Sequence, residues 1–334
     1  MNKLRKLFLL AFCVFFCVSV SASEISGTVR DGAGTSAVGY ADVVVVPESQ
    51  AIRTGADGRF RITNLPPGRY QVTVTQEGRL PETLKVEVTD DGLRDVDIPF
   101  HKAEPADQPV SRLKDWPWMS VADWHKKHAA NVARSRQGSL DVIFFGDSIT
   151  EQWETSGAKV WEKYFNTGHV ANFGIGGDTT QNLLWRIQNN DGLKGLSPEV
   201  VVVLIGTNNF GFSKHRPDEV ANGITAIVDA LCRQFPKTHV LLLGVLPRSP
   251  NPDAFVRGLI HEANGGIASL GNRPSVTYLD IESVLLTSTG QTREDIYTKD
   301  HLHLAENGYY VLLEILRPYL RKHLDEKTAQ RVFK

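Results

Sequence analysis

Apolar and polar positions follow two different patterns along this chain, and the pattern changes near residue 100. Between residues 24 and 100, apolar residues come in short β-rich runs separated by turns such as Asp31-Gly32, Asp57-Gly58 and Pro66-Pro67-Gly68. Short strands divided by Gly, Pro and Asp turns at this spacing are typical of a β-sandwich. The predicted strands cover residues 25–29, 41–46, 59–62, 70–75, 84–88 and 96–98.

From residue 115 to about residue 325, longer apolar runs alternate with segments of helical period. The run from Val200 to Ile205 is apolar throughout, which suits a parallel strand covered on both faces. This alternation predicts a doubly wound α/β fold, in which functional groups gather at the C-terminal ends of the strands. The predicted strands are 141–145, 169–173, 200–205, 239–245 and 276–281, and the predicted helices are 121–137 (capped by Ser120), one directly after Ser148, 178–189, 218–235 and 305–323.

Residues 101–114 separate the two patterns. Pro105 and Pro109 stand among polar residues there, which is typical of a linker. The sequence therefore predicts a β-sandwich over residues 24–100, a linker over 101–114 and an α/β domain over 115–325.

The first residues have the features of a signal peptide. Lys3, Arg5 and Lys6 precede an apolar run from Leu7 to Val20, which is too short to span a bilayer comfortably. Small residues at the end of this run suit cleavage after Ala22, so residues 1–22 are predicted to direct export to the periplasm or the medium. An uncleaved membrane anchor is the alternative. After cleavage, no stable membrane insertion is expected.

Charge and cysteine content limit the partners and the type of nucleophile that this chain is expected to use. The chain has 37 Lys and Arg against 38 Asp and Glu, so nothing favours nucleic acid or an anionic membrane as the main partner. Of the three cysteines, Cys13 and Cys17 fall in the signal peptide, so no internal disulfide is expected after cleavage. Cys232 lies at the edge of an apolar helical stripe and is predicted to be a small buried thiol. Any covalent catalysis must then use a nucleophile other than cysteine.

Ser148 is the candidate nucleophile. The segment Gly146-Asp147-Ser148 directly follows the apolar run 141–145, so it predicts a buried strand that ends in a turn and presents a serine at the start of a helix. N–H groups at a helix start can face a developing oxyanion. Asp147 is expected to anchor the turn by hydrogen bonds.

Three further fragments lie at predicted strand ends. Gly177 belongs to a glycine-rich segment, 172–180, whose backbone N–H groups can donate at close range. Asn208 follows the most apolar strand, where its amide can donate to an oxyanion. Asp300 and His303 are three residues apart, so one turn can bring the carboxylate to the imidazole. His301 adjoins Asp300 but is not favoured as its partner.

Together the four fragments resemble the SGNH hydrolases, or GDSL-type esterases, over residues 115–325. The segments 172–180, 206–209 and 183–186 are particularly similar to the platelet-activating-factor acetylhydrolase catalytic-subunit branch. The resemblance implies a flavodoxin-like sheet of five parallel strands, Ser148 as nucleophile, His303 as base and Asp300 as its orienting acid. It also implies an oxyanion hole made by Ser148, Gly177 and Asn208, with no cofactor or metal. Residues 24–100 resemble the carboxypeptidase regulatory-like domain, a transthyretin-like sandwich.

Other site types fit the sequence less well. The glycine segment departs from a dinucleotide-binding loop at Thr179, where the last glycine would stand. His125 and His128, and separately His301 and His303, lack the ligand count of a zinc site. His125 and His128 are expected to be polar positions on an amphipathic helix. A non-catalytic exported glycan- or protein-binding protein is a further alternative.

The substrate is expected to be a short-chain ester. The interval between Ser148 and Asn172 is short and includes no long apolar insertion, which favours an open site and an acetyl ester. Export and the β-domain favour deacetylation of a carbohydrate, whereas the branch resemblance points to a phospholipid acetylhydrolase or lysophospholipase-type lipase. Ile149 and Leu302 are predicted to line the acyl pocket or to belong to the core. Trp153, Trp161 and Trp185 are predicted to pack in the core or to stack on a sugar. The sequence carries no indication of an oligomeric state.

Overall fold

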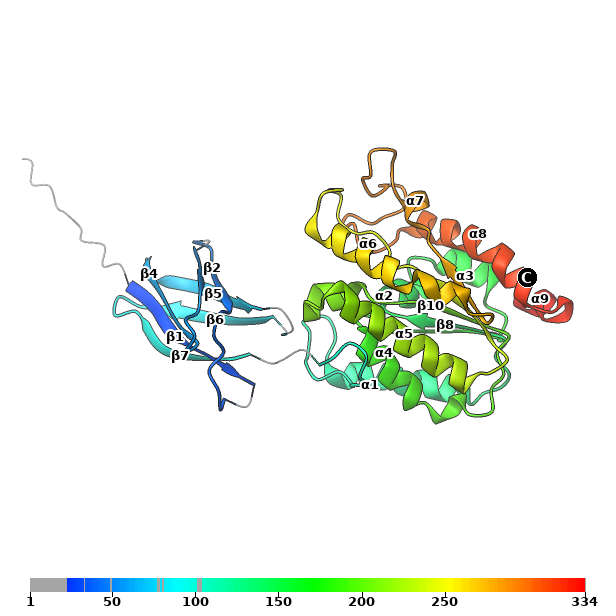
Figure 1. Ribbon diagram of the computed structural model, residues 1–334, viewed down its shortest axis with the longest axis horizontal. Coiled ribbons are helices and arrows are strands. Elements are labelled where there is room, and N and C mark those ends of the chain that lie inside the picture. The colour runs from blue at the N-terminus through cyan, green and yellow to red at the C-terminus, as the bar shows by residue number, and fades with distance from the viewer. Residues whose placement is uncertain are drawn as a thin grey trace, which may run out of the picture. The chain divides into compact units, whose positions relative to one another are not determined.

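The computed structural model describes residues 23–32, 34–48, 50–76, 79, 81–100 and 104–333 (Figure 1). The predicted signal peptide lies outside these residues. The chain divides into two compact units, and each is described here by itself. Within the described residues, no helix combines the length and the apolar character that crossing a membrane requires.

The first unit is a β-sandwich. One sheet has the order β4-β1-β7 and the other the order β3-β2-β5-β6. Alternate residues of β5, among them Tyr70, Val72 and Val74, are buried, and they share one core with Ile25 and Ile98 of the other sheet. The strands are β1 (Ser23–Asp31), β2 (Asp42–Val46), β3 (Gln50–Arg53), β4 (Arg59–Leu65), β5 (Gly68–Thr75), β6 (Glu82–Val88) and β7 (Leu93–Phe100). All six predicted strands are present, and the structure adds the short strand β3.

The second unit contains a five-stranded parallel sheet, as predicted. Its order is β12-β11-β10-β8-β9, which is the order of flavodoxin-like folds. Gly146 at the end of β8 pairs with Leu204 of β10 and with Gly174 of β9, so these three strands end at one level. The loops that follow them therefore meet at one edge of the sheet. The strands are β8 (Val142–Gly146), β9 (Val170–Gly174), β10 (Val200–Leu204), β11 (His239–Leu243) and β12 (Val276–Leu279).

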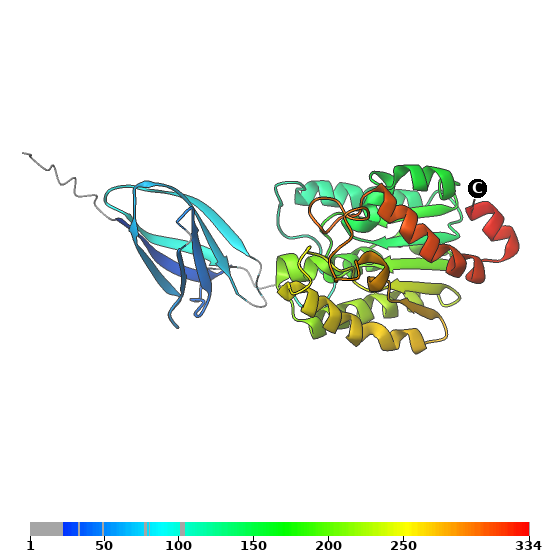
Figure 2. The same ribbon diagram turned by 90° about the horizontal axis from the view of Figure 1, so that it is seen from above.

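Helices cover both faces of this sheet (Figures 1 and 2). One core joins side chains of α4 (Thr180–Gln188), α5 (Pro217–Gln234) and α6 (Phe255–Ala268) to the sheet. The other core joins α3 (Ala158–Tyr164) and α8 (Glu306–His323) to the opposite face. The remaining helices are α1 (Val121–Ser135), α2 (Ser148–Glu151), α7 (Glu282–Leu285) and α9 (Glu326–Val332), with short 3-10 segments at Gln152–Glu154, Asp191–Leu193 and Ser269–Asn272 and a π-helical segment at Asn209–Ser213.

Residues 104–113, part of the predicted linker, pack on the second unit. The Ala106 carbonyl accepts a hydrogen bond from the Thr180 hydroxyl at 2.7 Å, and the Val110 N–H donates to the Gln181 carbonyl at 3.1 Å. Ala106 and Arg112 are buried. The prolines keep this segment irregular, but its hydrogen bonds fix it to the start of α4.

Candidate active site

Ser148 occupies the first position of α2, directly after β8. Asp147 caps this helix, and its Oδ1 accepts a hydrogen bond from the Ile149 N–H at 2.9 Å. This is the anchoring contact expected from the sequence. Burial raises the pKa of Asp147 to about 7, and the nearby Asp178 carboxylate acts in the same direction. Ser148 itself is half-buried. Its position directly after β8 puts its hydroxyl at the C-terminal edge of the sheet.

Ser148, His303 and Asp300 form one hydrogen-bonded chain. His303 Nε2 lies 2.9 Å from Ser148 Oγ, and His303 Nδ1 lies 2.6 Å from Asp300 Oδ2. Because an ionised carboxylate only accepts, Nδ1 carries the proton and Nε2 accepts from the Ser148 hydroxyl. The imidazole is therefore held in the tautomer that can remove a proton from Ser148.

The loop before α8 fixes Asp300. Asp300 Oδ1 accepts from the Thr298 hydroxyl at 2.7 Å and from the N–H groups of Leu302 and His303 at 2.9 Å each. Burial acts to raise the pKa of Asp300, but the hydrogen bonds from His303, Thr298 and Leu302 outweigh it and hold that pKa below its ordinary value. His301 turns away, with Nδ1 2.8 Å from Thr292 Oγ1, so the aspartate pairs with His303 as expected.

The glycine loop after β9 lies against Ser148. A Cβ built on Gly176 would be 3.8 Å from the Ser148 Cβ, and the Gly176 N–H donates to Glu151 Oε2 at 2.7 Å. Gly177 has φ of +74°, and a Cβ there would collide with the Trp118 ring. Glycine is thus required at position 177 both by the backbone conformation and by the close approach of Trp118.

Asn208, after β10, closes the same edge of the sheet. Its Nδ2 donates to the Asp178 carbonyl at 2.9 Å, and the amide has a second N–H. The neighbouring Asn209 holds the start of α4, because its Oδ1 accepts from the Thr180 N–H at 2.9 Å. The structure thus places Gly177 and Asn208 on two loops that are hydrogen-bonded to each other, and the first of these loops lies against Ser148.

A buried ionic network supports the glycine loop from behind. Asp178 Oδ2 accepts from Arg186 Nε at 2.7 Å, and Asp178 Oδ1 accepts from Trp124 Nε1 at 2.6 Å. Arg186 also donates to the Phe173 and Gly146 carbonyls at 2.8 and 3.1 Å. Arg112 adds a second cation 3.6 Å from Asp178 and donates to the Gly176 carbonyl at 2.8 Å. The ends of β8 and β9 and the glycine loop are therefore tied to one buried carboxylate.

Sequence reasoning missed four side chains of this region. Glu151 follows Ser148 by three residues, which is about one helical turn, so the spacing could have predicted that both side chains lie on the same side of the helix. Arg112 and Trp118 precede α1, where no motif marks them. Arg248 Nη1 reaches the Thr207 carbonyl and hydroxyl at 3.4 Å each. Burial lowers the pKa of Arg248, whereas the carboxylates of Asp300 and Asp147 act to raise it.

The apolar and aromatic residues that were predicted to line a pocket or to pack in the core lie mostly in the core. Ile149 is buried in the core beside α8, which is the core alternative, whereas Leu302 is half-buried. Trp153 and Trp161 belong to the same core, and Trp185 is half-buried against Trp124.

His125 and His128 were predicted to be polar positions on an amphipathic helix, and His128 instead lies on the buried face of that helix. His128 is buried, with Nε2 3.2 Å from the Asn189 carbonyl, and burial lowers its pKa to about 4. The reason is that α1 turns this face toward α4 and the aromatic ring of Trp185, 5.2 Å away. Cys232 is half-buried at the edge of the core, with Sγ 3.8 Å from Ser275 Oγ.

The arrangement has the parts needed for acyl transfer. A serine hydroxyl is paired with an oriented imidazole, and the glycine loop and Asn208 follow the neighbouring strands at the same end of the sheet. Across the part of the chain that the structure describes, no group of three or more His, Cys, Asp or Glu side chains could hold a metal ion.

Comparison with known proteins gives two family matches. Residues 144–311 match the GDSL-like Lipase/Acylhydrolase family, and residues 24–101 match the carboxypeptidase regulatory-like domain. The chain is 34% identical over 222 residues to platelet-activating factor acetylhydrolase IB subunit alpha1 of Bos taurus, covering 65% of this chain and 88% of that protein. It is also 34% identical over 215 residues to subunit alpha2 of Gallus gallus, covering 62% of this chain and 88% of that protein.

A solved structure gives the same fold. A GDSL-like lipase from Bacteroides thetaiotaomicron aligns with a TM-score of 0.50 and 23% identity, covering 60% of this chain and 98% of that one. This likeness concerns the fold of the second unit.

Proposed function

Since the chain belongs to the GDSL-like lipase/acylhydrolase family and is a hydrolase of ester bonds, we propose that it is an exported serine esterase that removes acetyl groups from a carbohydrate. One observation carries the serine mechanism, namely the hydrogen-bonded chain from Ser148 Oγ through His303 to Asp300. With the family membership, this intact chain argues against the alternative of a non-catalytic binding protein.

In the proposed mechanism, His303 removes the proton of Ser148 as its oxygen attacks the ester carbonyl. The N–H groups of Ser148, Gly177 and Asn208 stabilise the tetrahedral oxyanion, and one such donor is typically worth about 2.7–4 kcal/mol. His303 then protonates the leaving alcohol, and a water molecule attacks the acyl-enzyme by the same route. Asp300 stabilises the imidazolium that forms in each step.

Two observations support a short acyl group and a carbohydrate. The named relatives are acetylhydrolases, and their similarity extends over most of their length. Export, inferred from Lys3, Arg5 and Lys6 with the apolar run that follows, would bring the enzyme to glycans outside the cytoplasm. The same relatives favour a second candidate, a short-acyl phospholipid acetylhydrolase.

Ester hydrolysis tests the mechanism and the acyl length together. We expect the mature chain from Ser23 to hydrolyse p-nitrophenyl acetate fastest in a series from acetate to octanoate. We expect Ser148→Ala to lower kcat by at least about 10⁴-fold without loss of folding. Ser283→Ala, an exposed serine on α7, is the matched control and should keep full activity. Equal activity in the Ser148→Ala and native chains would refute the serine mechanism.

Substrate class and export need separate measurements. Release of acetate from acetylated xylan and from 1-O-alkyl-2-acetyl-glycerophosphocholine compares the two candidates directly, and faster release from the lipid would favour the second. N-terminal sequencing of protein from the periplasm or medium should begin at residue 23. A chain that retains Met1 in the cells would contradict export.

A further inference from the structure

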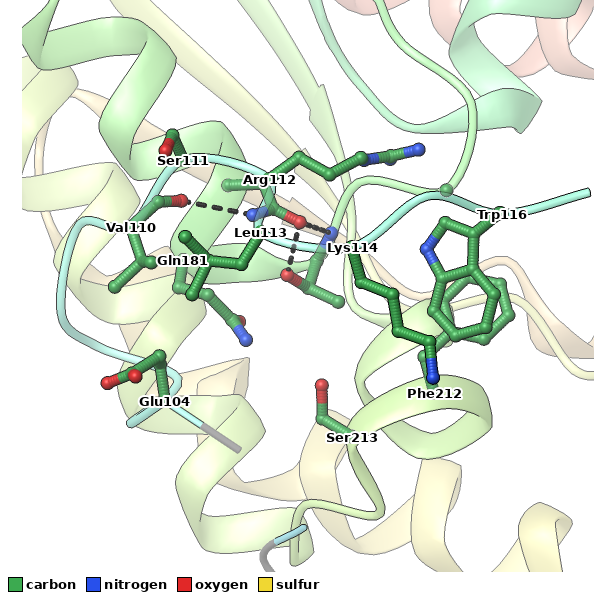
Figure 3. Close-up of a pocket in the computed structure, with 13 residues that line it drawn as sticks. Glu104, Val110, Ser111, Arg112, Leu113, Lys114, Trp116, Gln181, Phe212 and Ser213 are labelled. Carbon is green, nitrogen blue, oxygen red and sulfur yellow. Dashed lines mark hydrogen bonds between the residues drawn. The ribbon is translucent and has the colours of Figure 1, made fainter. Parts of the chain in front are cut away.

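A pocket beside the glycine loop is not used by the mechanism above. It has a volume of about 60 Å³ and lies between residues 110–116, the start of α4 and the π-helical segment Asn209–Ser213 (Figure 3). Gly177 forms part of its wall, which connects it directly to the oxyanion loop. The space accommodates about four water molecules, so it can take one edge of a sugar ring but not a long acyl chain.

The polar side chains of two largely buried residues point into this pocket. Figure 3 shows the Ser213 hydroxyl and the Gln181 amide nitrogen directed toward its centre. Ser213 is 1% exposed and Gln181 5% exposed, and among residues 104–333 neither Ser213 Oγ nor Gln181 Nε2 has a hydrogen-bond partner, so both atoms remain open to the pocket. An apolar ligand that filled the pocket would cover these two atoms without a hydrogen bond, which is costly, whereas a ligand with hydroxyl groups would pair with them.

An aromatic surface borders the pocket. The ring of Phe212 lies 4.5 Å from that of Trp116, and Trp118 lies 6.2 Å from Trp116 in a parallel plane. Trp118 is 53% exposed, although its ring also packs on Gly177. The surface of Trp116, Trp118 and Phe212 thus extends from the pocket to the oxyanion loop. The exposed Trp118 ring and the half-buried Trp116 and Phe212 rings form one contiguous apolar surface, which is suited to binding a ligand.

The charges around these rings discriminate between ligands. The Arg112 guanidinium lies 5.8 Å from the Trp118 ring, and Lys114 Nζ lies 5.8 Å from the Trp116 ring. Cations already adjoin these rings, so a quaternary ammonium headgroup would meet like charge there. A neutral sugar presents C–H groups on its face and hydroxyl groups at its edge, and it suits both the rings and the polar pocket.

We infer that Trp116, Trp118 and Phe212, with Ser213 and Gln181 behind them, form a subsite for the sugar ring of an acetylated carbohydrate. This inference rests on the proposed function and specifies it. The ring face lies on Trp118, the hydroxyl edge enters the pocket, and the acetyl ester extends past Gly177 to Ser148. The subsite therefore acts on the KM for sugar acetates, because it binds the part of the substrate that does not react.

The test compares two esters of the same acid. For 6-O-acetylglucose, which keeps its ring hydroxyl groups, we expect Trp118→Ala to lower kcat/KM about ten-fold, mainly through KM, and Trp118→Phe to restore most of it. For p-nitrophenyl acetate, which has no sugar, we expect a loss several-fold smaller. Phe255→Ala, which removes an 83% exposed ring on α6, is the matched control and should change neither ester.

A second variant guards against disturbance of the glycine loop by Trp118→Ala. Ser213→Ala removes only the hydroxyl that points into the pocket, and it should raise the KM for 6-O-acetylglucose about three- to ten-fold. If Trp118→Ala does not fold, the KM of Ser213→Ala for the sugar acetate tests the subsite instead.

The outcomes separate the two proposals. Equal losses on both esters in Trp118→Ala, or an unchanged sugar KM in Ser213→Ala, would overturn the subsite while the esterase function stands. A selective loss on 1-O-alkyl-2-acetyl-glycerophosphocholine would overturn it in favour of a headgroup site. An enzyme inactive on all these esters would instead refute the proposed function itself.

Discussion

Asp300 makes two kinds of contact, and only one of them concerns the charge of His303. Its Oδ1 holds the loop through Thr298, Leu302 and the His303 N–H, whereas its Oδ2 faces His303 Nδ1. In Asp300→Asn, the amide oxygen can keep the loop contacts, but its NH₂ group would then face Nδ1 and favour the wrong tautomer. We expect kcat for p-nitrophenyl acetate to fall by about 10³–10⁴-fold with little change in the unfolding midpoint.

Asp295→Asn is the control for Asp300→Asn. Asp295 lies on the same loop and pairs with Arg293 at 2.7 Å, where both side chains are accessible to solvent. Such a pair contributes little, so this variant should keep its activity. A loss of less than ten-fold in Asp300→Asn would show that Asp300 does not orient His303.

Asp147 links the nucleophile turn to the pH dependence of stability. Its pKa is about 7 in the folded chain against an ordinary value of 3.8, because the carboxyl is buried. Between about pH 4 and pH 7 the unfolded chain loses a proton that the folded chain keeps, so this group makes the protein less stable as pH rises. The contribution is up to about 4 kcal/mol above pH 7.

Asp147→Asn should remove this contribution. Asn keeps an oxygen for the Ile149 N–H and is an equally good helix cap, so the local contact survives. We expect the free energy of unfolding of the variant, relative to the native chain, to increase from pH 4 to pH 7 and then level off. Urea unfolding across this range measures it. A constant difference would mean that Asp147 is ionised in the folded protein at all these pH values.

At the scale of elements, Asp178 is the common anchor of the glycine loop, α1 and α4. Asp178→Asn would leave Arg186 and Arg112 without a compensating charge in the interior. Removing one partner of a buried ion pair costs about 3–5 kcal/mol, and we expect a loss of that size in urea unfolding. Asp191→Asn provides the contrast, since its pair with Arg136 is exposed and should contribute less than about 1 kcal/mol. Similar values for both variants would contradict this role.

The elements that the sequence predicts well are those with a strong apolar pattern. Val200–Leu204 is buried at every position and could be recognised directly. Helix α6 was not predicted, because Gly258, Gly265 and Gly266 lower its helix propensity. The packing of residues 104–113 could not be predicted either. It depends on Ala106 and Val110 backbone groups, which bond to α4 and leave no mark in the side-chain pattern.

The same reasoning applies to the site. Ser148, Gly177, Asn208 and His303 stand at strand ends or before a helix, so the parallel topology brings them together. Trp118 and Arg112 reach the glycine loop from a segment without regular structure, and only the tertiary fold shows this. The role of Ser213 could not be predicted from the sequence, because it depends on the π-helical segment that directs its hydroxyl into a pocket.

At the scale of the whole molecule, the hydrogen bonds described above for Ser148, His303, Asp300, the glycine loop and Asn208 join residues of the second unit to one another, and we therefore expect this unit to be a complete small-ester hydrolase. We expect a chain starting at His101 to hydrolyse p-nitrophenyl acetate with kcat/KM within about two-fold of the chain starting at Ser23.

A chain starting at Asp115 would lack Arg112 and the partners of Thr180 and Asn182. Each buried group left unpaired costs about 1–3 kcal/mol, so this chain should unfold at clearly lower urea concentration and lose activity. If it were as stable as the chain from His101, the packing of residues 104–113 on the second unit would not contribute to its stability. If the chain from His101 were inactive while folded, residues 23–100 would contribute to the hydrolysis of small esters.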